Sequence, residues 1–88
     1  MNNWNIQFAK NTAKKLNITL NKMHWKIIFC MRNFYKKYNI TPSTRILLQY
    51  MKKKNIFLTS QDLFILFPNG FMKNASKISG IPVNNNCF

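Results

Sequence analysis

Acidic residues are almost absent from this sequence. Asp62 is the single acid among 88 residues, against 14 Lys and Arg, so the formal net charge is +13. Hydrolysis by paired carboxylates and binding of a divalent metal by a carboxylate cage each need more than one acid. The sequence therefore excludes both kinds of site.

Histidine, cysteine and glycine are scarce as well. The His and Cys residues are His24, Cys30 and Cys87, so a zinc site lacks its fourth ligand and any Cys-x-x-Cys pair. Two glycines are too few for a glycine-rich phosphate loop. We predict no metal and no cofactor, and most hydrolase and nucleotide chemistry is excluded.

Long apolar runs are also missing. Runs such as 64–67 end well before the roughly 20 residues needed to span a bilayer. The start of the chain lacks the basic, apolar and small-residue pattern of a secretory signal. We expect no transmembrane helix, no membrane partner and a cytoplasmic location, where both cysteines would be free thiols.

The basic charge has two interpretations. A net charge of +13 is typical of proteins that bind a polyanion such as nucleic acid. Asn, Lys, Ile and Phe all have A+T-rich codons, however, so a biased genome would supply many lysines without a binding role. Direct contact with nucleic acid is left open.

Two helices are predicted in the first half of the chain. The first covers residues 5–16, where apolar residues recur at helical spacing. The second is capped by Asn21 and continues to Tyr38. Its apolar residues cover more than one face, so we expect it to cross the centre of the core: Trp25, Ile27, Ile28, Phe29, Cys30, Phe34 and Tyr35.

Three shorter helices follow. One begins with Thr41 as N-cap and Pro42 in its first turn, and ends at lysines 52–54. Its expected inner stripe is Ile46, Leu47, Tyr50 and Met51. The next is capped by Ser60 and stops at residues 68–70. The last covers 71–78, and Gly80 would end it in a left-handed conformation.

These elements predict a mostly α fold, a small orthogonal helical bundle. No segment alternates well enough for a strand, and no heptad is sustained as in a coiled coil. A chain of 88 residues is long enough for one domain. We place that domain at 1–80, followed by a flexible C-terminal arm at 81–88 because its Asn-rich sequence offers little to bury.

The one histidine and the two cysteines are interpreted differently from one another. His24 begins the long helix and is interpreted as a hydrogen-bonded structural residue. Cys30 lies among large apolar residues, so we expect an inert, buried thiol with a raised pKa. Cys87 stands on a polar stalk with lysines 73 and 77 upstream, which favour the thiolate that acts in sulfur exchange.

The sequence resembles the TusE/DsrC family of small sulfur carriers from about Trp4 onward. The shared motifs are His24-Trp25, Arg32-Asn33-Phe34-Tyr35, Pro42 with Arg45, Leu66-Phe67-Pro68-Asn69-Gly70, Lys77-Ile78-Ser79-Gly80-Ile81-Pro82 and the penultimate Cys87. Three departures are visible: the family's N-terminal β-hairpin is expected to be missing, Asn33 replaces an acid, and the segment 54–60 is shorter and more apolar than usual.

The resemblance implies a function for Cys87. Family members that work with dissimilatory sulfite reductase carry a second arm cysteine, and that position here is Ser76. The single-cysteine, TusE-like branch is therefore implied: a sulfurtransferase whose Cys87 accepts a persulfide sulfur from the TusB–TusC–TusD complex, through TusD. It passes the sulfur to the tRNA-thiouridylase MnmA, bound to tRNA, for wobble-position 2-thiouridine synthesis.

Arg45 and Lys77 are candidate supporting residues on a basic face near the arm, and the alternative for each is a solvated cation. Two other functions are kept open. One is a DsrC-like partner of dissimilatory sulfite reductase, which needs a second arm thiol. The other is a basic nucleic-acid-binding module, which would bind more weakly in salt and would not depend on Cys87.

Overall fold

A computed structural model describes residues 4–82 of the chain. Within that range it contains five helices and no strand: α1 (Ile6–Lys15), α2 (Lys22–Tyr38), α3 (Thr44–Lys52), α4 (Ser60–Leu66) and α5 (Phe71–Ser79). The predicted helical bundle is confirmed. No helix of the described part is long and apolar enough to cross a membrane.

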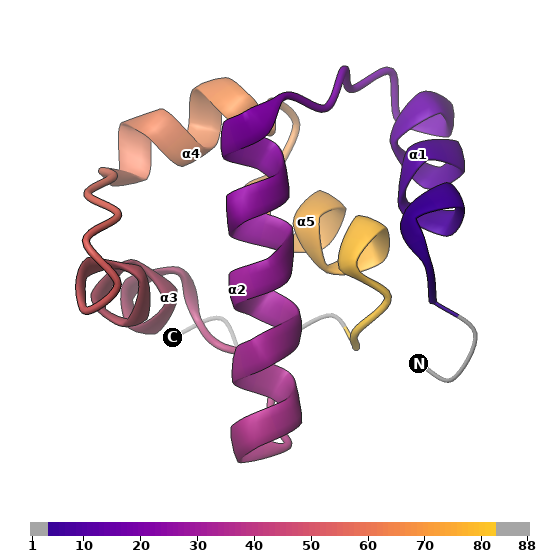
Figure 1. Cartoon of the computed structure of the whole chain (residues 1–88). Coiled ribbons are helices and arrows are strands. Elements are labelled where there is room, and N and C mark those ends of the chain that lie inside the picture. The colour runs from indigo at the N-terminus through magenta and orange to yellow at the C-terminus, as the bar shows by residue number, and fades with distance from the viewer. Residues whose placement is uncertain (1–3, 83–88) are drawn as a thin grey trace.

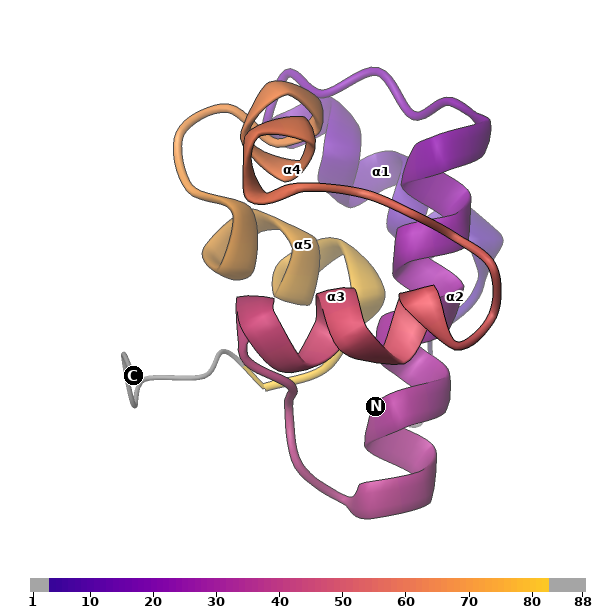
Figure 2. The same ribbon diagram turned by 90° about the vertical axis from the view of Figure 1, so that its left-hand side faces the viewer.

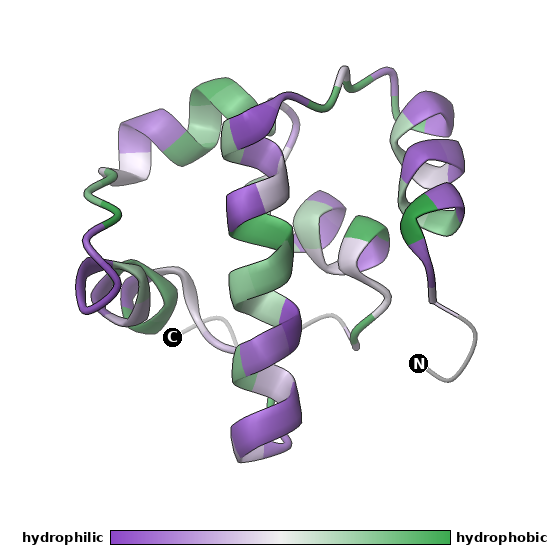
Figure 3. Cartoon of the chain, in the orientation of Figure 1, coloured by the Kyte–Doolittle hydropathy of each residue, from purple (hydrophilic) through white to green (hydrophobic). Residues whose placement is uncertain are grey.

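The long helix α2 is the centre of the bundle, as its apolar residues predicted. It packs against α5 and α3, while α1 packs against α5 and α4 contacts both α3 and α5. Figure 1 shows α1 and α3 on opposite sides of α2, and Figure 2 shows α5 between α3 and α4 in the turned view. Figure 3 shows that the middle of α2 is hydrophobic and its C-terminal end hydrophilic.

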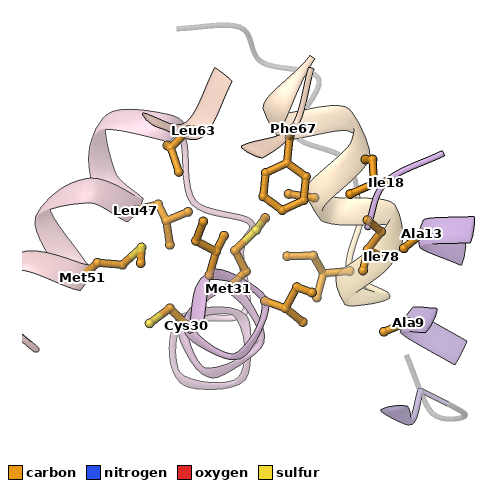
Figure 4. Packing of buried hydrophobic residues seen from close by; sticks show 14 residues of the cluster. Ala9, Ala13, Ile18, Cys30, Met31, Leu47, Met51, Leu63, Phe67 and Ile78 are labelled. Carbon is orange, nitrogen blue, oxygen red and sulfur yellow. The ribbon is translucent and has the colours of Figure 1, made fainter. Parts of the chain in front are cut away.

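One hydrophobic core joins all five helices. Met31 of α2, Ile78 of α5 and Phe67 after α4 are fully buried and point toward one another (Figure 4). Leu47, Met51 and Leu63 close the core on the α3–α4 side. Phe29 and Ile46 were expected inside, but each is 43% exposed because the core needs only one stripe of each helix.

Two helix starts differ from the sequence prediction. The N-cap of α3 is Ser43, whose hydroxyl accepts from Ile46 N, and not Thr41. Pro42 precedes the helix and is fully buried. The N-cap of α4 is Thr59, because Thr59 and Asp62 exchange hydrogen bonds in a capping box, so Ser60 is the first helical residue instead.

Asparagine ends three of the helices. Asn17, Asn39 and Asn55 follow the last turns of α1, α2 and α3, and Asn69 lies in the turn between α4 and α5. All four have φ between 60° and 73°. Asn is the non-glycine residue that adopts this left-handed conformation most readily. The chain has two glycines, so asparagine takes over the helix-terminating role that glycine usually has.

Candidate functional site

The predicted sulfur-carrying Cys87 lies outside the described residues, as does the predicted arm from residue 83. The described chain that leads to it is the end of α5 and residues 80–82. We call this segment, with the side chains that bind it, the C-terminal anchor: residues 76–82 with Trp4, Arg32 and Thr41. The predicted boundary between domain and arm after residue 80 stays a prediction.

The anchor begins with a tight helix ending. Gly80 has φ 71°, as predicted, and its N–H donates to the carbonyl of Lys77 at 3.3 Å. The N–H of Ile81 donates to the carbonyl of Ser76 at 3.1 Å. This pair of bonds is the Schellman motif, which satisfies carbonyls that the end of a helix leaves unpaired.

Two side chains from distant parts of the chain satisfy the next carbonyls. The indole Nε1 of Trp4 donates to the carbonyl of Ile78, and the guanidinium of Arg32 donates to that of Ser79, each at 2.8 Å. The Arg32 guanidinium carbon also lies 4.0 Å from the centre of the Trp4 ring, in a cation–π contact. A cation at this end of α5 also faces the negative end of the helix dipole.

Burial lowers the pKa of Arg32 from its ordinary value, but the guanidinium remains a cation at neutral pH. Arg32 therefore acts in the anchor as a permanently charged donor. Its position on α2 ties the end of α5 to the central helix.

The anchor leaves no room for a side chain at position 80. A Cβ placed on Gly80 would lie 2.5 Å from Cδ1 and 3.2 Å from Cγ of Trp4. Gly80 is therefore required twice, for its backbone conformation and for the close approach of the indole.

The chain remains fixed beyond the helix. Ile81 is buried, with 5% of its surface exposed. The hydroxyl of Thr41 donates to the carbonyl of Pro82 at 2.6 Å, which joins the connection between α2 and α3 to the end of the described chain. Pro82 is thus the last described point of attachment before Cys87.

Of the two candidate supporting residues, Lys77 belongs to the anchor and Arg45 lies on α3, after the anchor residue Thr41. Lys77 is exposed in the last turn of α5, and Arg45 is exposed in the first turn of α3. Neither side chain has a hydrogen bond or ion pair with another residue between 4 and 82. The structure does not bring the two into contact, so a supporting role for either stays a prediction.

Ser76, which the sequence resemblance equates with a second arm cysteine, is fully buried in α5. Its hydroxyl lies 3.5 Å from the sulfur of Met72 in the same helix. The described chain thus places a buried alcohol, not a thiol, at this position.

Cys30 is buried as predicted, with 5% of its surface exposed. Burial raises the pKa of its thiol, and the positive charge of Lys54 lowers it by less. The thiol is therefore protonated at neutral pH and shielded from reagents.

His24 has the structural role predicted for it. Its Nδ1 accepts from the N–H of Asn21 at 3.1 Å, completing a capping box for α2. Its Nε2 lies 2.7 Å from the carbonyl of Leu66, so Nε2 carries the proton of the neutral ring. Within residues 4–82, no three His, Cys, Asp or Glu side chains cluster as metal ligands would.

Sequence reasoning missed the roles of Trp4, Arg32 and Thr41. Trp4 and Ile78 are 74 residues apart, and such contacts leave no local pattern. The available signal was a tryptophan close to the chain start and an arginine on the expected apolar face of α2.

The comparisons with known proteins match this chain over all or nearly all of its length. The family model described as "DsrC like protein" matches residues 1–88. A protein of Buchnera aphidicola from Acyrthosiphon pisum, named sulfurtransferase TusE, is 48% identical over 97% of this chain and 76% of its own length. A protein of Sodalis glossinidius with the same name is 37% identical over 100% of this chain and 83% of its own.

Two solved structures have the same fold. The NMR structure of Allochromatium vinosum DsrC superposes with a TM-score of 0.88 at 34% identity, over 100% of this chain and 80% of that one. The oxidized gamma-subunit of dissimilatory sulfite reductase (DsrC) from Archaeoglobus fulgidus gives a TM-score of 0.84 at 32% identity, over 99% and 82%.

Proposed function

This chain belongs to the family of DsrC-like proteins, and we propose that it is a persulfide carrier whose sulfur is held on Cys87. Relatives named sulfurtransferase support a role in sulfur transfer. The burial of Cys30 carries the finer proposal, because the chain has two cysteines and Cys30 is shielded with a raised pKa. Cys87 is then the thiol available for exchange.

The transfer needs no external oxidant. The Cys87 thiolate attacks the outer sulfur of a donor persulfide, the donor's S–S bond breaks, and the donor thiolate leaves and takes up a proton. Cys87 then carries a persulfide. The acceptor enzyme receives this outer sulfur, and the Cys87 thiolate is released.

The anchor supports this role mechanically. Pro82 is fixed by Thr41, and four residues separate it from Cys87. At about 3.5 Å per residue, the cysteine can reach about 17 Å from Pro82. A fixed base with a short polar extension presents a thiol to a partner's active site without distorting the bundle.

We propose the cytoplasmic tRNA-thiolation relay as the setting. In it the TusB–TusC–TusD complex supplies the sulfur through TusD, and the MnmA–tRNA complex receives it for 2-thiouridine. Arg45 and Lys77 are proposed as exposed cations near the path of the segment that carries Cys87.

The second candidate is a partner of dissimilatory sulfite reductase, the assembly named for the Archaeoglobus structure. That role needs a second thiol to close a disulfide with Cys87. Ser76 occupies the corresponding position and is fully buried, and Cys30 is shielded in the core. Both observations favour the single-cysteine carrier.

Intact-mass spectrometry after incubation with a persulfide donor tests the proposal. We expect wild type and Cys30→Ala to gain one sulfur atom that a thiol reductant removes, and Cys87→Ser to gain none. Cys30→Ala is the matched control, because it removes the other cysteine. A sulfur adduct that persists in Cys87→Ser, or tRNA thiolation supported by that variant in cells, would contradict the proposal.

A further inference from the structure

A groove is lined by residues of α1, of the connection between α1 and α2, and of the start of α2. Figure 1 shows α1 on the side of α2 opposite α3. Its volume is about 470 Å³, within the range of pockets that hold small organic ligands. It is lined by Lys10, Ala13, Lys14, Asn17, Ile18, Thr19, Leu20 and Trp25. None of these residues belongs to the C-terminal anchor.

The rim of the groove carries uncompensated positive charge. Lys10 and Lys14 are exposed and lie one turn apart on α1, so their ammonium groups repel each other. The single acid, Asp62, is used in the capping box of α4. No carboxylate therefore offsets these lysines within the described residues.

Trp25 gives the groove an aromatic wall. The ring is half-buried and stacks on Phe29, with ring centres 5.9 Å apart. Other aromatic rings are covered by cations of the chain: Trp4 by Arg32, Tyr38 by Lys37 and Tyr50 by Lys54. In residues 4–82, no such cation covers Trp25.

Polar side chains complete the lining. The side chains of Asn17 and Thr19 have no hydrogen-bond partner between residues 4 and 82. Asn17 is held in the left-handed conformation, with φ 60°, at the end of α1. An amide and a hydroxyl are thus available beside the aromatic wall and the two ammonium groups.

We propose that this groove binds a segment of single-stranded RNA, with a base against Trp25 and phosphates against Lys10 and Lys14. Aromatic rings combined with a cationic groove are the usual means of holding single strands, because every base has a π-face and every nucleotide a phosphate. Asn17 and Thr19 can bond the edge of the base. The choice of RNA over DNA rests on the proposed function. The fit of the groove to a single strand depends only on its side chains and not on the proposed function.

Fluorescence anisotropy with a labelled single-stranded RNA oligonucleotide tests the proposal on the full chain. The Cys87→Ser background is used, so that binding is measured without thiol chemistry. We expect Lys10→Gln/Lys14→Gln to weaken binding at least tenfold. The slope of log affinity against log salt should become shallower by about 1.4, since each phosphate contact contributes about 0.7 for single strands.

A matched control separates the groove from general charge. Lys52→Gln/Lys53→Gln removes the same charge from exposed lysines at the end of α3, where Lys52 lines a hollow together with the exposed Phe57. This control should change the affinity by less than threefold. Equal losses from the two lysine pairs would overturn the proposal, since attraction to the overall charge would then explain the binding.

Trp25 substitutions test the base contact. Trp25→Leu should lower the affinity about fivefold or more, and Trp25→Phe should retain most of it, because base stacking needs the ring and not the indole N–H. Melting followed by circular dichroism checks that both variants fold. The proposal is overturned if Trp25→Leu binds RNA as tightly as wild type, or if duplex RNA binds as tightly as the single strand. It is also overturned if an acidic peptide binds the groove more tightly than the RNA and displaces it.

The outcome is separable from that of the carrier proposal. Lys10→Gln/Lys14→Gln should still accept a sulfur atom on Cys87, and Cys87→Ser should still bind RNA. If wild type gains a sulfur atom but Cys87→Ser binds no RNA, the groove proposal alone has failed. If Cys87→Ser binds RNA through the groove but wild type gains no sulfur atom, the carrier proposal alone has failed.

Discussion

Gly80→Ala should destabilise the protein by about 2.5–4 kcal/mol. A left-handed conformation costs an alanine about 1–2 kcal/mol, and Gly80 has φ 71°. The added Cβ would lie 2.5 Å from Cδ1 of Trp4, so the indole must move. That movement breaks the bond to Ile78 and the contact with Arg32, worth about 1 kcal/mol and about 0.5–1 kcal/mol.

Urea unfolding followed by circular dichroism measures this loss. A domain of 88 residues has a free energy of unfolding of about 4–13 kcal/mol, so the expected loss is a large fraction of it. The unfolding midpoint should therefore fall clearly, while the slope of the transition stays the same.

Two comparisons separate the backbone cost from the steric cost. Gly80→Asn tolerates the left-handed conformation, as four asparagines of this chain do, but it still carries the Cβ that meets Trp4. It should be intermediate between wild type and Gly80→Ala. In a Trp4→Ala background, Gly80→Ala should cost only the backbone term of about 1–2 kcal/mol. The reasoning fails if Gly80→Asn matches wild type, or if Gly80→Ala costs the same with and without Trp4.

Two further predictions concern Arg32 and Cys30. Arg32→Met keeps an apolar stem but leaves the Ser79 carbonyl without its charged donor. The free energy of unfolding, measured in urea, should therefore fall by about 1.5–3 kcal/mol, and the amide of Ile81 should exchange faster. Unchanged exchange at Ile81 would contradict the role of Arg32 in the anchor. Because burial raises the pKa of Cys30, alkylation of Cys30 in Cys87→Ser should be slow at neutral pH and accelerate only above the ordinary cysteine range. The thiol of Cys30 contributes to the stability of the protein at pH values below its pKa in the unfolded state, and this contribution is lost as the pH rises through its pKa in the folded state. Fast alkylation of Cys30 at pH 7 would contradict its burial.

The helices were predictable because their signals are local. Asn21 at the start of α2 and Gly80 at the end of α5 act on neighbouring backbone groups, and both were identified correctly. The start of α3 was misplaced because Thr41 and Ser43 flank Pro42 and both are good caps. The choice depends on a distant contact, since the Thr41 hydroxyl binds Pro82.

The three left-handed asparagines that end α1, α2 and α3 were missed for a different reason. Glycine is the usual marker of a helix end, and this chain has two. Asn17, Asn39 and Asn55 take that role after α1, α2 and α3, so some of its asparagines have a structural function that codon bias alone does not explain.

The anchor also constrains how a carrier of this kind can act. A cysteine limited to about 17 Å from Pro82 by chain length can serve only partners whose active sites come within that distance of Pro82. One thiol enters one active site at a time, so the sulfur would be accepted and passed on in two successive steps. The groove beside Trp25 lies on the α1 side of α2, opposite α3. An RNA segment held there would leave the region around Pro82 open to the enzyme that receives the sulfur.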